Sequence, residues 1–325
     1  MSKIRRIDAH QHVLFDAYLA ELETMGISGS AERAFPEWSK AQMLDNMAEF
    51  EIYAVAVSIS SPGTYFGDID FTKRLVRICN DCFAELSGQS ENRIASLGLL
   101  PLPDTEAACR EVAYLYDELG LDGVGLVSHY NDIYIGDPEF EELYQELNRR
   151  QAVVFVHPVR PMSAPAMQYS FPSGFVELVA ATGRVIANLL ATGVMERYPD
   201  IKWYLPHSGG IIPSILYRLL KFESLPKFQA QVPKGVRTYL KRIYYDVAQA
   251  SEPEILSALM QFADPDKILF GTDYPFAIDR NSVIQDTIDG IEKFEGFDGA
   301  LRQKVYRGNA RALFPRFQKY NLGAE

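Results

Sequence analysis

Short apolar runs alternate with helical patterns along almost the whole chain of 325 residues, and this alternation is the strongest constraint on its fold. The run Tyr53–Ser60, for example, is β-branched and nearly all apolar, which is typical of a parallel strand buried on both faces. Eight such strands, each followed by a helix, are expected at 3–8, 53–60, 93–100, 123–128, 152–156, 201–205, 243–247 and 267–270. Eight βα units without a composition break predict an α/β fold, a (β/α)8 TIM barrel, as one domain over residues 1–325.

Two parts of the chain depart from this repeat. Residues 13–39 contain Gly26, Gly29 and Pro36 and show no sustained period. We expect them to form a loop excursion over the mouth of the barrel, with a short helix around 18–25. C-terminal helices are predicted after the eighth strand. No Gly-rich phosphate turn of the GxGxxG type follows the first strand, which argues against a dinucleotide-binding sheet.

Composition excludes several classes of protein. A net charge of −11 argues against nucleic acid as a partner. The N-terminus lacks the apolar core of a signal peptide, and no apolar run was expected to approach the length that spans a bilayer. Three cysteines, Cys79, Cys82 and Cys109, form an odd count that fits a reducing compartment, and the single CxxC spacing is interpreted as two cysteines on one helix. We therefore expect a soluble, cytoplasmic protein without a membrane partner.

Histidines are rare in this chain, and every one lies at the end of an expected strand. In a (β/α)8 barrel the active site forms at the C-terminal ends of the strands. An HxH pair alone is a weak motif, but His10 and His12 would project to one side if the first strand continues that far. A common site is therefore the favoured hypothesis for the five histidines and the acid after the eighth strand: His10, His12, His129, His157, His207 and Asp273.

Imidazole nitrogens and a carboxylate are ligands that suit zinc, and also manganese or iron. Three histidines and one aspartate with an open position describe a catalytic rather than a structural metal site. Asp273 has an alternative role as a helix N-cap, but a cap does not require the buried strand in front of it.

Together, four motifs resemble the amidohydrolase superfamily, and specifically its metal-dependent decarboxylase branch. The resemblance extends from Asp8 to Phe314. This branch includes aminocarboxymuconate-semialdehyde, γ-resorcylate and 6-methylsalicylate decarboxylases. The motifs are Asp8-x-His10-x-His12, Val156-His157-Pro158, His207-Ser208-Gly209-Gly210 and Gly271-Thr272-Asp273-Tyr274-Pro275.

The resemblance implies one divalent metal, with Zn²⁺ expected first and Mn²⁺ second, and no organic cofactor. The fourth strand ends at His129 without a lysine or glutamate that could bridge two metals. The resemblance also implies a homodimer or homotetramer. The implied metal ligands are His10, His12, His157 and Asp273, and the implied catalytic residues are His207 and Asp273.

By the same resemblance, the reaction is a non-oxidative decarboxylation of a small aromatic, hydroxybenzoate-like acid or of an unsaturated carboxylic acid, with release of CO2. Asp273 or a metal-linked water would protonate the ring carbon that bears the carboxylate, and His207 would stabilise or relay charge. Hydrolysis of a lactone or related cyclic ester is the alternative, because it would use the same ligands. A non-catalytic metal-binding barrel and a scaffold role are less favoured, since no strand-end residue is missing.

Aromatic and proline-rich loops around the expected rim indicate a mostly apolar pocket for a small planar acid. Arg160, three residues after His157, is the candidate that steers an anionic substrate, with a surface salt bridge as the alternative. Asp8 is expected to orient the metal ligands from beneath. The other candidate substrate contacts are Trp38, His129 and Tyr274, each of which could instead serve packing or hydrogen bonding.

Overall fold

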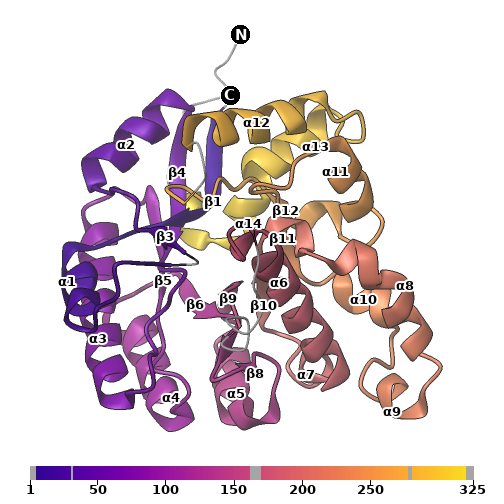
Figure 1. Cartoon of the computed structure of the whole chain (residues 1–325). Helices are drawn as coiled ribbons and strands as arrows, with labels where there is room; N and C mark the ends of the chain where they lie inside the picture. Colours follow the sequence, from indigo (N-terminus) through magenta and orange to yellow (C-terminus); the bar gives the residue numbers. More distant parts are fainter. Residues whose placement is uncertain (1–4, 31, 162–169, 277–279, 320–325) are drawn as a thin grey trace.

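The computed structural model describes residues 5–30, 32–161, 170–276 and 280–319. Eight parallel strands form one sheet in the order β1-β4-β5-β6-β9-β10-β11-β12, and helices surround them (Figure 1). The strands are β1 (Arg6–His12), β4 (Ile52–Ser58), β5 (Ile94–Gly98), β6 (Gly123–Val127), β9 (Val153–His157), β10 (Lys202–Leu205), β11 (Tyr244–Asp246) and β12 (Ile268–Leu269).

The segment that follows β12 closes the sheet against β1. The Ala9 N–H donates to the Phe270 carbonyl at 2.9 Å, and the His12 N–H donates to the Tyr274 carbonyl at 2.7 Å. Gln11 and Tyr274 form a parallel bridge at the same seam. These bonds confirm the predicted (β/α)8 barrel.

β1 continues to His12, four residues beyond the predicted end. The backbone is therefore extended through both histidines, as required for His10 and His12 to project to the same side. All seven of its residues are buried, as expected for a strand covered on both faces. The ring of Phe155 on β9 lies 5.0 Å from the ring of His10 and 4.5 Å from that of Tyr204. Aromatic packing inside the barrel thus supports the histidines from within.

The helices follow the predicted alternation, and several begin at side chains that cap them. Ser39 accepts a hydrogen bond from the Gln42 N–H at 3.2 Å, and Asp68 and Asp104 also accept bonds from the first turns of their helices. The α-helices between the strands are α2 (Lys40–Glu49), α3 (Ile69–Gly88), α4 (Thr105–Ala113), α5 (Glu141–Arg149), α6 (Gly174–Ala191), α7 (Val194–Arg197), α8 (Ile212–Phe222), α9 (Pro226–Gln229), α10 (Val236–Leu240) and α11 (Pro253–Leu259). The C-terminal helices are α12 (Arg280–Lys293), α13 (Gly299–Gln303) and α14 (Asn309–Leu313).

The excursion after β1 is more ordered than its sequence suggests. It contains α1 (Asp16–Thr24) and an antiparallel hairpin of β2 (Gly29–Ser30) and β3 (Arg33–Ala34). A Cβ at Gly29 would lie 2.1 Å from the Arg33 carbonyl oxygen, so this close pairing requires glycine. A second hairpin, β7 (His129–Tyr130) and β8 (Ile133–Tyr134), follows β6.

One expectation about membranes is wrong. α6 has 18 residues and is long and apolar enough to cross a bilayer by length and composition, although the sequence was expected to contain no such run. Its apolar side chains serve the barrel instead: Ala181, Val185, Ile186 and Leu189 are all fully buried. A helix that packs on a parallel sheet needs this much apolar surface.

Candidate active site

Four side chains from three parts of the barrel converge on one point at the C-terminal ends of the strands. His10 and His12 end β1, His157 ends β9, and Asp273 follows β12. All four are buried, and one nitrogen or oxygen from each lies within 4.8 Å of the others. Asp273 Oδ1 lies 3.0 Å from His12 Nε2, 3.5 Å from His10 Nε2 and 4.0 Å from His157 Nε2.

The unsatisfied atoms of this cluster fit a metal ion. His157 Nε2 and Asp273 Oδ1 are buried and have no hydrogen-bond partner among the described residues. His10 Nε2 and His12 Nε2 lie 3.0 Å apart and share a hydrogen bond, so both nitrogens point into the space that His157 Nε2 and Asp273 Oδ1 also face. Buried polar atoms without partners cost free energy, and a divalent cation bound by all four side chains would give a partner to the two atoms that lack one. The donor set of three imidazoles and one carboxylate suits zinc or another transition metal.

The other ring nitrogens are held by neighbours that fix each imidazole. His10 Nδ1 lies 3.0 Å from Asp246 Oδ2, and His12 Nδ1 lies 2.9 Å from the hydroxyl of Ser58. His157 Nδ1 donates to the carbonyl of Pro158 at 2.9 Å. Such contacts select the tautomer that presents Nε2 to a metal.

Asp8 links β1 to the segment after β12 by hydrogen bonds beside the cluster. It accepts hydrogen bonds from the His10 N–H at 3.0 Å, the Gln11 amide at 2.8 Å and the Thr272 hydroxyl at 2.6 Å. Burial raises the pKa of Asp8 to about 6, although the bonds from Thr272 and Gln11 oppose this shift. A Cβ at Gly271 would lie 2.8 Å from His10 Cβ, so only glycine lets the segment pass this close to the ligand.

The three histidine ligands differ in their pKa values. Burial lowers the pKa of His12 and lowers that of His157 well below its usual range. Burial would also lower the pKa of His10, but the carboxylates of Asp246 and Asp273 outweigh it and raise the value to about 9. Burial alone would raise the pKa of Asp273, but the charge of His10 and the close His12 ring hold it well below its usual range.

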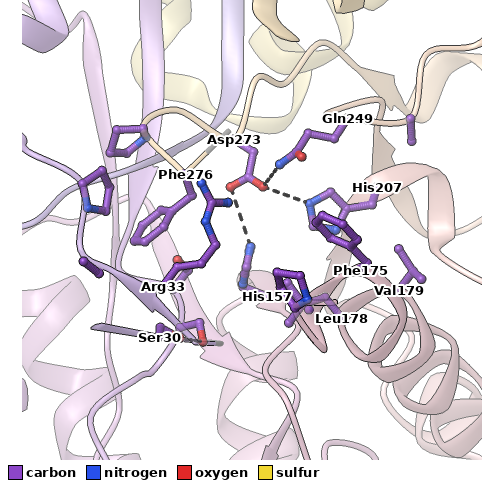
Figure 2. A pocket seen from close by; sticks show the side chains of 18 residues that line it. Ser30, Arg33, His157, Phe175, Leu178, Val179, His207, Gln249, Asp273 and Phe276 are labelled. Carbon is purple, nitrogen blue, oxygen red and sulfur yellow. Dashed lines mark hydrogen bonds and ion pairs between the residues drawn. The ribbon is translucent and has the colours of Figure 1, made fainter. Parts of the chain in front are cut away.

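A second group of side chains contacts Oδ2 of Asp273, the oxygen that faces away from the ligand cluster. His207 Nε2 lies 3.3 Å from Asp273 Oδ2, and Gln249 Nε2 donates to the same oxygen at 2.5 Å (Figure 2). All three residues have positive φ, 57° for His207, 52° for Gln249 and 61° for Asp273. Strained backbone of this kind concentrates at functional sites. The carboxylate therefore presents Oδ1 to the ligand cluster and Oδ2 to a hydrogen-bonding pair.

A cavity of about 470 Å³ opens above these side chains, a size suited to a small organic ligand. His157, His207 and Asp273 form its polar floor, and its apolar wall includes Phe175, Leu178, Val179 and Phe276. Arg33, on β3, extends into it from the side opposite His207 in Figure 2. Within the described part of the chain, no carboxylate pairs with the Arg33 guanidinium.

The four predicted substrate contacts lie outside the described lining of this cavity. Arg160 forms an ion pair with Glu32, and His129 Nε2 donates to the Arg160 carbonyl at 3.3 Å. Trp38 packs edge-on against Phe15 and lines a separate groove, and Tyr274 is buried in the barrel seam. Their role in binding substrate remains a prediction. Residues 162–169, part of the proline-rich loop expected at the rim, lie outside the described residues.

Four residues of the site escaped the sequence analysis: Ser58, Asp246, Gln249 and Arg33. Asp246 had a usable signal, because it is an acid at the end of an apolar strand, as Asp273 is. Arg33 and Gln249 had none, since each lies in a segment without periodicity whose direction depends on tertiary contacts.

The chain matches the model of the amidohydrolase family over residues 7–316. It belongs to this family. A 6-methylsalicylic acid decarboxylase of Penicillium expansum is 30% identical to it over 322 residues, which cover 96% of this chain and 97% of that protein. A gamma-resorcylate decarboxylase of Polaromonas sp. (strain JS666) is 24% identical, over 82% of this chain and 85% of that protein. The predicted superfamily is thereby confirmed.

Solved structures agree with this assignment. A crystal structure described as an amidohydrolase II superposes with a TM-score of 0.86 at 28% identity and covers 95% of this chain and 99% of that one. A dihydroxybenzoic acid decarboxylase of Polaromonas sp. JS666, crystallised with manganese and the inhibitor 2-nitroresorcinol, gives 0.81 at 20% identity, over 96% and 97% of the two chains. At 20% identity, this likeness concerns the fold alone.

Proposed function

We propose that this amidohydrolase is a metal-dependent, non-oxidative decarboxylase of a small hydroxybenzoate-like acid. The observation that carries the proposal is the buried cluster of three histidines and Asp273. Two of its members, His157 and Asp273, form the floor of an apolar cavity together with the neighbouring His207. The predicted carboxy-lyase class agrees with the decarboxylases among its relatives.

The cavity suits a planar aromatic acid on three grounds. Its walls offer the rings of Phe175 and Phe276 to an aromatic face. Arg33 offers a guanidinium that can bind a carboxylate or phenolate. A cation held by His10, His12, His157 and Asp273 would act as a Lewis acid and anchor the anionic end of the substrate.

Decarboxylation requires a proton at the ring carbon as the bond to the carboxylate carbon breaks. The electron pair of that bond stays on the ring, and CO2 leaves. His207 and Asp273 share a hydrogen bond at the cavity floor, so His207 can hold the proton at Nε2 beside the Asp273 carboxylate and deliver it into the cavity. Gln249 steadies the same oxygen. The apolar wall keeps water away from the ring.

For the metal we propose a single divalent cation, with Zn²⁺ as the first expectation because three imidazoles favour it. Mn²⁺ is the second, and the manganese in the related dihydroxybenzoic acid decarboxylase supports including it in any test. We also propose a homodimer or homotetramer in the cytoplasm. Sedimentation would test the assembly, and a monomer would count against it.

Lactone hydrolysis is the competing function, because the same ligands serve it. None of the relatives named above is described as a lactone hydrolase. The deciding experiment offers hydroxybenzoates and lactones to protein loaded with Zn²⁺ or Mn²⁺ and follows CO2 release and ring absorbance. CO2 release that His207→Ala abolishes supports the decarboxylase, whereas lactone opening without CO2 rejects it.

A further inference from the structure

The β2–β3 hairpin bridges two sides of the cavity mouth. Ser30 and Arg33 both line the cavity, so one face of the hairpin forms part of its roof. On one side, the Ser30 hydroxyl shares a hydrogen bond with the hydroxyl of Ser61, which follows β4. On the other side, Glu32 meets the β9 and α6 side of the barrel. Two strands, β5 and β6, separate β4 from β9 in the sheet, so the hairpin spans the opening.

Among the described residues, Glu32 makes the hydrogen bonds and the ion pair of the hairpin on the second side. Its carboxylate accepts a hydrogen bond from the Ser173 N–H at 3.1 Å and from the Ser173 hydroxyl at 2.9 Å. It also forms an ion pair with Arg160, whose guanidinium lies 3.5 Å from the same hydroxyl. Three donors from two segments therefore converge on one acid from the hairpin.

The position of Ser173 explains why a carboxylate belongs there. Ser173 precedes α6, and its own side chain does not cap the helix. Glu32, 141 positions earlier in the chain, accepts the backbone N–H of this N-cap residue and so brings a carboxylate to the positive end of an 18-residue helix. The first turns of α6 carry Phe175, Leu178 and Val179, which line the cavity. The contact thus ties the hairpin to the apolar wall.

We propose that Glu32 is a positioning residue that fastens the β2–β3 hairpin to α6 and thereby holds Arg33 over the metal cluster. Glu32 has a φ of 61°, and its carboxylate contacts Ser173 and Arg160 while the next residue, Arg33, extends into the cavity. Both partners of the ion pair are partly exposed, with 45% and 32% of their side-chain surface accessible. Exposed pairs are individually weak, so the bonds from Ser173, which is buried, are needed beside the ion pair to hold the hairpin.

Trypsin provides a direct test, because Arg33–Ala34 is a cleavable bond inside the hairpin. Arg160→Ala breaks the fastening without changing the sequence around that bond. Glu32→Ala breaks all of its contacts. We expect cleavage after Arg33, mapped by mass spectrometry, to accelerate by about fivefold or more in both variants, since proteolysis follows the population of the open state. Arg149→Ala, which removes an exposed arginine paired with Glu146 on α5, is the matched control and should leave the rate unchanged.

The kinetic arm rests on the proposed decarboxylation, and the proteolytic arm does not. If the acid is decarboxylated, Glu32→Ala should raise KM more than it lowers kcat, because Arg33 remains present but is less well placed. Unchanged cleavage after Arg33 in both variants, at an unchanged melting temperature, would overturn the proposal. Cleavage that accelerates equally at barrel sites would show general unfolding and overturn it too. Faster cleavage after Arg33 alone supports it, even if no CO2 is released.

Discussion

Asp246 accepts a hydrogen bond from His10 Nδ1 at 3.0 Å and so directs His10 Nε2 toward the other side chains of the histidine and aspartate cluster. The same carboxylate accepts the Tyr204 hydroxyl at 2.6 Å and the His207 N–H at 3.1 Å. One buried acid on β11 therefore sets the orientation of a proposed metal ligand, His10, and of the backbone that carries His207, the proposed catalytic histidine.

Asp246→Asn should weaken metal binding by about 10–100-fold, the usual effect of losing a carboxylate behind a histidine ligand. The amide keeps the shape but cannot accept all of these bonds. Competition with a chelator of known affinity would measure the change. Asp122→Asn is the matched control: Asp122 is also a largely buried acid but pairs with Arg316, so that variant should lose stability and keep metal affinity.

Metal binding should release about one proton near pH 7.5. In the metal-free protein the pKa of His10 is about 9, so this imidazole is protonated at that pH, whereas burial keeps His12 and His157 neutral. A metal ion must displace the proton from His10 Nε2. Affinity should increase about tenfold per pH unit below about 9, and as release falls toward zero above that pH, affinity should level off. Calorimetry in buffers of different ionisation enthalpy measures the proton count, and no release at pH 7.5 would contradict this assignment.

Arg33→Leu should raise KM for an aromatic acid by roughly 10–100-fold with a smaller effect on kcat, because a hydrogen bond to a charged group is worth about 1.5–3 kcal/mol. Steady-state kinetics would show the split. Arg74→Leu, which removes an arginine that packs on Phe71 of α3, controls for the loss of one positive charge. An unchanged KM in Arg33→Leu would remove this residue from the binding site.

Gln249→Leu should lower kcat by about tenfold while the protein keeps its metal, because Asp273 Oδ2 loses a donor at 2.5 Å but Oδ1 keeps its place. Metal content per chain and kcat, measured on the same preparation, separate the two effects. Loss of metal in parallel with activity would instead make Gln249 a support of the ligand cluster.

The sequence predicted that these histidines and Asp273 would lie together because barrel strands end at one rim and because histidine is rare in this chain. His10, His12, His157 and Asp273 converge as strand order requires, although their roles await experiment. The cavity walls were harder to predict. Arg33 enters through a hairpin in an aperiodic segment, and its placement depends on contacts with Ser61 and Ser173 that lie far away in the chain.

Arg160 illustrates the same difficulty. Its nearness to His157 in sequence suggested a role at the cavity, but the chain turns after β9 and its guanidinium meets Glu32. A strand fixes the direction of its own side chains, whereas three residues of loop do not. Sequence spacing therefore predicts side-chain position well at strand ends and poorly just beyond them.

The most direct test of the central claim is decarboxylation in D2O. Metal-loaded protein acting on a hydroxybenzoate should release CO2 and place one deuterium on the ring carbon that bore the carboxylate, as seen by NMR and mass spectrometry of the product. His207→Ala should lose this activity, and chelation should abolish it until metal is restored. A metal-loaded, folded protein that opens lactones but neither releases CO2 nor deuterates the ring of any hydroxybenzoate would contradict the account.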